Sequence, residues 1–202
     1  MKPKYYSLIE LIDMVDEPNK AICHRLFIDN KDLFEKARGS NHNHQAWVGG
    51  YLDHLTEIMN IAVVLYPVLN NLRPLPFTLS DSLLVLYLHD LEKPWRYTTT
   101  TDGTWQVNPD LADKKRQVES FVEQKIKDYG FVLTEEHFNG IKYAEGEKDD
   151  YSAEKRTQLP LAAFVHTCDS WSARGWFNFP LESGDSWTNA KRRKPNHERS
   201  RN

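Results

Sequence analysis

Apolar residues recur along most of this chain at the spacing of one helix face. Between Leu8 and Val15 they fall three to four residues apart, and Ser7 stands where an N-cap is expected. The same spacing predicts helices over six further segments: 19–37, 50–66, 80–93, 111–128, 134–145 and 159–173. The alternation typical of strands is nearly absent. The pattern therefore predicts an all-α fold.

Turn-forming residues separate the predicted helices. We expect Gly39 to end the second helix, Pro67 to end the third and Ser80 to cap the fourth. Residues 97–110, "YTTTTDGTWQVNPD", combine β-branched residues with turn formers. A small β-hairpin near residues 97–107 is therefore the one departure from helix that we expect.

Composition and charge exclude several classes of protein. Hydrophobic residues make up 40% of the chain and charged residues 27%, a balance typical of globular proteins. The net charge of −3 gives no overall attraction to nucleic acid or to a membrane. The N-terminus carries acids among its apolar residues, unlike a signal peptide, and no run reaches the ~18 apolar residues of a membrane helix. Cys23 and Cys168 have no ligand spacing, so we expect a reducing, cytoplasmic setting.

The length suits a single domain, which we place at residues 1–180. Residues 181–202 form a polar and basic C-terminal tail. Its last twelve residues, "KRRKPNHERSRN", hold six basic side chains and one acid, with no apolar residue to bury. We therefore expect this tail to be disordered, as a solubilising segment or a weak contact to nucleic acid.

Polar residues interrupt the apolar faces of three predicted helices. His54 shares a face with Leu55 and Ile58, His89 and Asp90 end the most apolar helix, and Asp169 lies in "LPLAAFVHTCDSW". A lone buried histidine is usually a satisfied core residue, but an isolated buried carboxylate is costly unless it is paired, protonated or metal-bound. A divalent ion accounts for all four residues together. Two imidazoles and two carboxylates suit Mn, Fe, Co, Ni, Mg or Zn.

These residues stand in an order that resembles the HD superfamily of metal-dependent phosphohydrolases. "HNHQAWVGGYLDHLTEIM" resembles the segment that leads to the first ligand, "LYLHDLEKPW" the HDxxK helix end, and "LAAFVHTCDSWSAR" the last ligand helix. Together they cover residues 42–174. The resemblance, closest to the HD domain of bacterial OB-fold-plus-HD 3′→5′ exoribonucleases, implies an HD-type helical bundle. It also implies metal ligation by His54, His89, Asp90 and Asp169.

The chain departs from HD enzymes that bind two metals. Those enzymes have further histidines where this sequence reads "HFNGIKYAEGE", with Tyr143 and Ala144 at the expected histidine pair. The resemblance therefore implies one ion. A second ion held by His44 and Glu145 is the alternative.

Three residues are candidates for catalysis. A bound ion would acidify a water, and Asp90 or Glu92 would take a proton from it. Glu92 is equally explained as a solvated residue at a helix end. Lys93 follows the His-Asp pair by three residues, so its charge could stabilise the phosphoryl oxygens; the alternative is an exposed lysine favoured by the helix dipole.

Four basic residues are candidates for substrate binding: His42, His44, Lys93 and Arg96. The two histidines lie in a polar turn before the first ligand helix, where capping or solvent exposure explains them nearly as well. His166 shares a face with Asp169 and is either a supporting residue or a buried polar group. Trp47, Trp95 and Trp171 could stack on a base, although aromatics at such places more often belong to the core.

The sequence thus predicts a hydrolase that cleaves a phosphoester, most simply of a nucleotide or deoxynucleotide. A small nuclease that acts on single-stranded ends is the second interpretation. A non-catalytic regulator that keeps the metal and binds a nucleotide is the third. A phosphorylated small molecule is the expected partner, with nucleic acid less favoured and no membrane.

Overall fold

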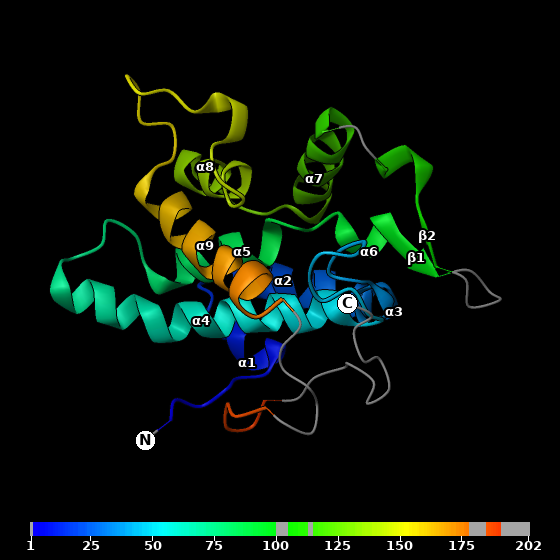
Figure 1. The fold of residues 1–202 in the computed structure, drawn as a ribbon, viewed down its shortest axis with the longest axis horizontal. Helices are drawn as coiled ribbons and strands as arrows, with labels where there is room; N and C mark the ends of the chain where they lie inside the picture. The colour runs from blue at the N-terminus through cyan, green and yellow to red at the C-terminus, as the bar shows by residue number, and fades with distance from the viewer. Residues whose placement is uncertain (1, 100–104, 113–114, 178–184, 191–202) are drawn as a thin grey trace.

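The computed structural model describes residues 2–99, 105–112, 115–177 and 185–190, and it is predominantly helical (Figure 1). The α-helices are α1 (Leu8–Ile12), α2 (Asn19–Asp29), α3 (Lys31–Lys36), α4 (Gly50–Leu72), α5 (Leu79–Leu88), α6 (Lys93–Arg96), α7 (Lys115–Tyr129), α8 (Glu135–Lys142) and α9 (Pro160–Ser170). Short 3-10 turns span Pro109–Leu111 and Lys148–Asp150, and a π-helical turn, Trp171–Gly175, follows α9. The expected all-α class is confirmed.

The expected hairpin is also present. Strand β1 (Tyr97–Thr99) pairs antiparallel with β2 (Trp105–Val107), and Tyr97 lies opposite Val107. The residues that join the strands, 100–104, lie outside the described part of the chain. The hairpin follows α6 directly and lies at the edge of the helical body (Figure 1).

The core is built around α4, which α5 and α9 pack against (Figure 1). The N-terminal half of α4 and nearly all of α5 are buried. This burial follows from composition, because α5 offers almost no polar face and must be covered on several sides. Helices α4, α5 and α9 are the three that carry the predicted metal ligands.

Two predicted helix boundaries were wrong. The segment 19–37 forms two helices because Asn30 leaves helical geometry and its side chain bonds the carbonyl of Leu26 at 2.9 Å. Pro67 lies inside α4 instead of ending it. An interior proline costs about 3 kcal/mol, but the helix beyond it is held by packing. Tyr66 donates its hydroxyl to the carbonyl of Phe77 at 2.9 Å, and Leu69 packs against the core.

The cap of α5 also differs from the prediction. Thr78, not Ser80, is the N-cap, and it forms a capping box with Asp81. Ser80 instead accepts a hydrogen bond from the backbone of Asp16 at 2.8 Å. Thr78 precedes Asp81 by three residues, the spacing that a capping box requires, and Ser80 has no acid at that distance.

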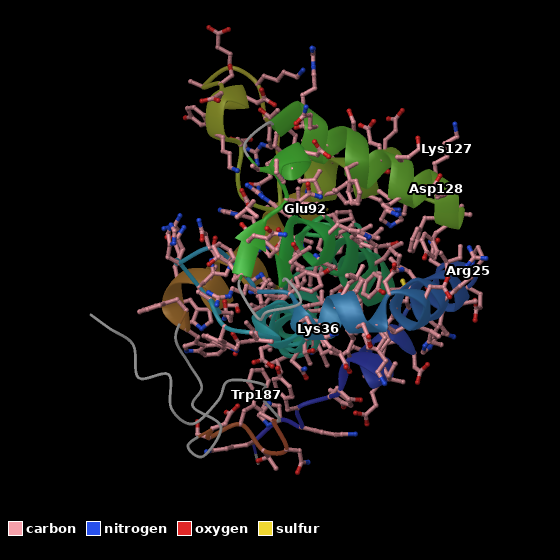
Figure 2. All side chains as sticks on the ribbon, turned by 90° about the vertical axis from the view of Figure 1, so that its right-hand side faces the viewer. Arg25, Lys36, Glu92, Lys127, Asp128 and Trp187 are labelled. Atoms are coloured by element: carbon pink, nitrogen blue, oxygen red, sulfur yellow. The ribbon has the colours of Figure 1, made fainter. Side chains whose placement is uncertain are left out.

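Residues 185–190 fall within the segment that we expected to be a disordered tail, and the structure packs them against the N-terminus (Figure 2). Trp187 makes an edge contact with Tyr5 and donates to the carbonyl of Pro3, while Thr188 accepts from the Tyr5 backbone. Burial of an aromatic side chain explains the difference, since Trp187 is an apolar residue within a polar segment. Residues 181–184 and 191–202 of the predicted tail lie outside the described part of the chain.

Helix α4 passes the length and composition test for a membrane span, contrary to the expectation that no segment would. More than half of its apolar window, 56%, is buried inside the protein, as in the core helix of a globular domain. One helix that passes this test is weak evidence that the chain crosses a membrane. His54 and Asn60, both fully buried, lie on this helix.

Candidate metal centre

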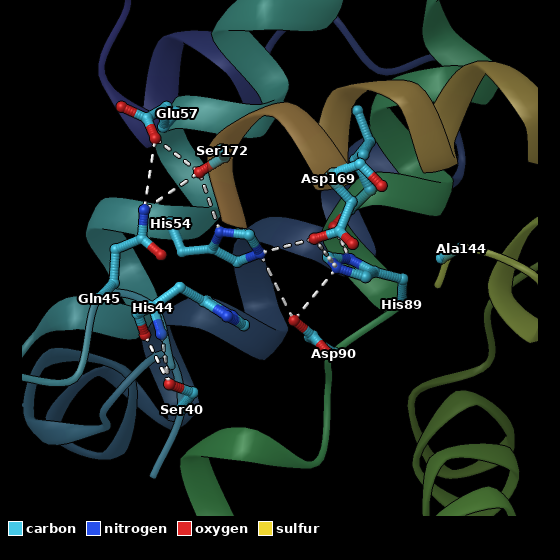
Figure 3. Close-up of polar contacts among 12 residues, drawn as sticks. Ser40, His44, Gln45, His54, Glu57, His89, Asp90, Ala144, Asp169 and Ser172 are labelled. Carbon is cyan, nitrogen blue, oxygen red and sulfur yellow. Dashed lines mark hydrogen bonds and ion pairs between the residues drawn. The ribbon is translucent and has the colours of Figure 1, made fainter. Parts of the chain in front are cut away.

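The four predicted metal ligands converge from three helices (Figure 3). His54 comes from α4, His89 and Asp90 from the end of α5, and Asp169 from α9. One oxygen of each carboxylate faces both imidazoles. The Asp90 oxygen lies 3.1 Å from Nε2 of His89 and 3.6 Å from Nε2 of His54. The Asp169 oxygen lies 3.1 Å from Nε2 of His54 and 3.7 Å from Nε2 of His89.

The end of α5 explains why adjacent residues can point into one site. His89 is the C-cap, and residues 89–92 form a turn before α6 begins at Lys93. The last carbonyls of a helix have no partner within it. Nδ1 of His89 bonds one of them, that of Leu86, at 2.8 Å. A carbonyl can only accept, so Nδ1 donates to it, and Nε2 is the ring nitrogen that faces the centre.

His54 presents the same atom. Its Nδ1 contacts the Ser172 hydroxyl at 3.1 Å, and its Nε2 points at the two carboxylates. Among the described residues, neither Nε2 has a well-formed hydrogen-bond partner, although both are buried. Two buried imidazole nitrogens beside two carboxylates are the kinds of donor that a divalent ion binds.

The distances between the ligand atoms fit a single ion. Ligands about 2.1 Å from a metal lie ~3.0 Å apart in an octahedral arrangement and ~3.4 Å apart in a tetrahedral one. The four contacts, at 3.1 to 3.7 Å, are close to this range. His54, His89 and Asp90 form a group that could hold a metal ion. Asp169 lies beside this group, with an oxygen 3.1 Å from Nε2 of His54.

The charges of the centre depend strongly on one another. Burial favours the neutral form of His89, but Asp90 and Asp169 outweigh it and raise the pKa of His89 well above its usual value. In His54 burial prevails and lowers the pKa. Burial opposes ionisation of the carboxylates as well, yet the neighbouring histidines, and Lys93 beside Asp90, hold the pKa of Asp90 and of Asp169 far below normal. The site therefore favours ionised carboxylates at Asp90 and Asp169, balanced by positive charge on His89 and Lys93.

Lys93 fits neither the expected contact with a substrate phosphate nor the alternative of an exposed lysine at a helix end. It is only 6% exposed, and its Nζ lies 2.5 Å from Oδ2 of Asp90. It is not among the side chains that line the cleft described below. Burial acts against its charge, but Asp90 and Glu92 outweigh this and raise the pKa of Lys93. Lys93 is buried because the turn at 89–92 packs its side chain against Asp90 instead of leaving it at an exposed helix end.

Glu92 is buried rather than solvated. Burial and the charge of Asp90 raise the pKa of Glu92 to about 7. Arg96 forms an ion pair with it, with Nη1 of Arg96 3.7 Å from Oε1 of Glu92. A carboxyl group with this pKa can both take and give a proton near neutral pH. Of the two interpretations of Glu92, the solvated one does not fit the structure.

His44 lies at the centre and His42 does not. The ring of His44 is tilted against that of His54, with 5.0 Å between centroids (Figure 3). Its buried Nε2 has no hydrogen-bond partner among the described residues. Burial and the charge of Lys93 lower the pKa of His44 to about 3, so the ring is neutral. His42, two residues earlier, is exposed.

A cleft of about 590 Å³ opens onto one side of the centre. Its lining includes His89, Asp90, Glu92 and Arg96 together with side chains of α7 and α8. The guanidinium of Arg96 donates to the carbonyl of Ala112 at 2.7 Å, while its Nε has no partner among the described residues. Arg96 is therefore the predicted substrate-binding residue that does line the cleft.

The alternative of a second ion is not favoured by the arrangement. Glu145 lines the cleft but pairs with Lys148. Ala144, next to it, lies across the His-Asp cluster from His44 (Figure 3). His166 bonds the carbonyl of Ala144 at 2.8 Å, so this histidine supports the connection between α8 and α9.

The tryptophans near the motifs divide between core and surface. Trp47 is buried and donates to Asp53 at 2.8 Å, and Trp95 packs against Phe121. Trp171 is 55% exposed and lies beside Trp176. The core interpretation therefore holds for Trp47 and for the partly buried Trp95.

Three buried polar residues behind His54 were missed: Gln45, Glu57 and Ser172 (Figure 3). Glu57 follows His54 by three residues and so shares its helix face. That spacing was the available signal for Glu57. Ser172 and Gln45 gave none, because they reach the site from segments more than 100 residues apart.

Comparisons of the chain with protein-family models, with curated proteins and with solved structures give no significant match. Any account of its function depends on the geometry of the site and on the sequence motifs.

Proposed function

We propose that this protein is a metal-dependent phosphohydrolase of the HD superfamily that cleaves a small phosphoester, most simply a nucleotide. One observation carries the proposal: two imidazole Nε2 atoms and two carboxylates converge beside a cleft that His89 and Asp90 help to line. The order and context of the ligands in the sequence support the superfamily.

The residues of the chain would divide the work of hydrolysis. His54, His89, Asp90 and Asp169 would hold a divalent ion, which when bound polarises a phosphoryl oxygen and acidifies a water. Water attacks phosphorus, the ester P–O bond breaks, and inorganic phosphate and an alcohol leave. Glu92, whose pKa is raised to about 7, would accept a proton from the water and pass one to the leaving alcohol.

The basic residues take roles that follow from their burial. Arg96 lines the cleft, so its guanidinium is available to a substrate phosphate. Lys93 is paired with Asp90, and its charge would offset that of the carboxylates rather than bind substrate directly. His44, neutral and beside His54, would serve as a hydrogen-bonding group to a phosphate oxygen.

The cleft favours a small substrate over a nucleic-acid strand. About 590 Å³ lies within the ~300–1,000 Å³ of small-molecule sites. Its lining includes five carboxylates, namely Asp90, Glu92, Glu119, Glu123 and Glu145. Of the basic side chains there, Lys142 and Lys148 already pair with Asp150 and Glu145. A polyanionic strand would be repelled along most of this surface.

A substrate screen tests the proposal. Wild-type protein loaded with Mn²⁺ or Zn²⁺ is offered nucleotides, cyclic dinucleotides and short oligonucleotides. Release of phosphate from mononucleotides is the expected result. Shortened oligonucleotides would favour the nuclease, and tight nucleotide binding without turnover would favour the regulator.

A matched pair of histidine variants ties the activity to the site. His89→Gln should lower metal affinity by more than the ~10–100-fold that loss of a supporting residue costs, and turnover with it. His24→Gln is the control, because His24 pairs with Asp13 on the surface at 2.8 Å. Equal metal content in the two variants would remove the basis of the proposal.

A further inference from the structure

The hydroxyl of Ser172 lies at the meeting point of three side chains behind the metal centre (Figure 3). It is 3.1 Å from Nδ1 of His54, 2.5 Å from Oε2 of Glu57 and 3.2 Å from Nε2 of Gln45. Each of the four residues is at most 1% exposed. Ser172 therefore cannot reach a substrate, and it is not a nucleophile.

Counting protons assigns the direction of each hydrogen bond. The Glu57 carboxylate can only accept, so the single hydroxyl proton of Ser172 goes to it. The Gln45 amide nitrogen can only donate, so Ser172 accepts from it. Ser172 then has a lone pair left for His54, and Nδ1 of His54 must be the donor.

The Gln45 side chain is held where this network needs it. Its backbone has a φ of +40°, donates to the carbonyl of Phe177 at 3.0 Å and accepts from Gly39 at 3.0 Å. Gly50 lies so close that a Cβ there would be 1.9 Å from the Gln45 carbonyl oxygen. This packing directs the Gln45 amide toward Ser172 and Glu57.

The position of His54 in its helix explains why side chains are needed. His89 orients itself on the Leu86 carbonyl because it stands at a helix end, where carbonyls are free. His54 is the fifth residue of a 23-residue helix. The carbonyls of that interior are occupied by the helix itself. A hydroxyl from another segment supplies the acceptor instead.

We propose that Gln45, Glu57 and Ser172 are positioning residues that hold His54 with a proton on Nδ1, so that Nε2 is the ring nitrogen directed at the metal centre. The inference rests on the proposed function for the ion, but the hydrogen bonds that place the proton on Nδ1 exist without one.

The test combines a direct view of the tautomer with metal affinity. Long-range ¹H–¹⁵N correlation spectra of the metal-free protein report which ring nitrogen of His54 carries the proton. Zn²⁺ titration by calorimetry gives the affinity. Wild type should show protonated Nδ1. Ser172→Ala should give mixed tautomers and a Zn²⁺ affinity ~10–100-fold weaker.

Two further variants sharpen the result. Glu57→Gln keeps the shape but lets the amide donate to Ser172, so the hydroxyl proton can turn to Nδ1 and favour the opposite tautomer. Ser170→Ala is the matched control, since within the described part of the chain the Ser170 hydroxyl contacts the ring of His166, at 3.5 Å, and not His54. If Ser172→Ala does not fold, the nearly isosteric Glu57→Gln still tests whether the network sets the position of the proton on His54.

The outcomes separate this inference from the proposed function. An unprotonated Nδ1 in wild-type His54 overturns the inference, as does a folded Ser172→Ala with unchanged protonation of Nδ1 and unchanged Zn²⁺ affinity. A wild-type protein that keeps protonated Nδ1 in a Ser172-dependent way, yet binds no divalent ion, supports the inference and overturns the proposed function.

Discussion

The ammonium nitrogen of Lys93 lies 2.5 Å from Oδ2 of Asp90, and both side chains are buried at the candidate metal centre. Removing one partner of such a pair leaves an uncompensated buried charge. Lys93→Met, which keeps the length of the side chain, should destabilise the metal-free protein by about 3–5 kcal/mol. Urea unfolding in the presence of a chelator measures the difference.

The same substitution should respond to metal. A divalent ion bound at the centre can neutralise Asp90 in place of Lys93, so added Zn²⁺ should narrow the gap between Lys93→Met and wild type. Lys36→Met is the control, because Lys36 is exposed and 3.7 Å from Asp32; its effect should stay within about 0.5 kcal/mol. Indistinguishable stability of the two variants would contradict a buried pair at Lys93.

Removing metal should lower the stability of the wild-type protein, and this loss should depend on the residues of the candidate metal centre. A ligand at 100 times its Kd adds about 2.7 kcal/mol of stability, so a chelator should lower Tm measurably. Asp169→Asn should lose most of this response, because its carboxylate faces both imidazoles. Asp128→Asn, a change on α7 (Figure 2), should retain it. A chelator-sensitive Tm in Asp169→Asn would place the ion elsewhere.

Two glycines distinguish crowding from backbone strain. Gly50→Ala puts a Cβ 1.9 Å from the Gln45 carbonyl oxygen, so the loop must move, at a cost of about 3 kcal/mol or more. Gly130→Ala has open space but a φ of +77°, and should cost only about 1–2 kcal/mol. Chemical denaturation compares them. Only Gly50→Ala should also weaken Zn²⁺ binding, since Gln45 moves with the loop.

The capping box of α5 should make stability depend on acid pH. Burial opposes ionisation of Asp81, but hydrogen bonds from Thr78 and from His137, at 3.0 Å, lower its pKa in the folded state. A lowered folded pKa stabilises the protein above the unfolded value of about 3.9. This contribution is lost as the pH falls through the folded pKa.

Asp81→Asn should therefore cost about 1 kcal/mol at pH 7, and the difference from wild type should shrink below about pH 4. Unfolding curves at pH 7 and pH 3 provide the measurement. Asp32→Asn, at an exposed site on α3, serves as the control. A deficit in Asp81→Asn that is equally large at pH 3 would rule out ionisation of Asp81 as its source.

The sequence by itself determined the helical class, the hairpin and the set of four residues that converge. Helix periodicity is a local property, and so is the contrast of His54 or Asp169 with an apolar helix face. Local signals failed where two of them competed, as at Thr78 and Ser80, or where packing outweighed a local cost, as at Pro67.

Only the tertiary structure decided the environment of each functional side chain. The sequence offered Lys93 as a residue acting on the substrate phosphate or as an exposed lysine at a helix end. It is buried because the turn at 89–92 folds it onto Asp90. Ser172 meets Glu57 across 115 positions of sequence. Contacts over such separations depend on how whole helices pack. No local pattern encodes that packing, because the energy that selects it comes from burying many side chains at once.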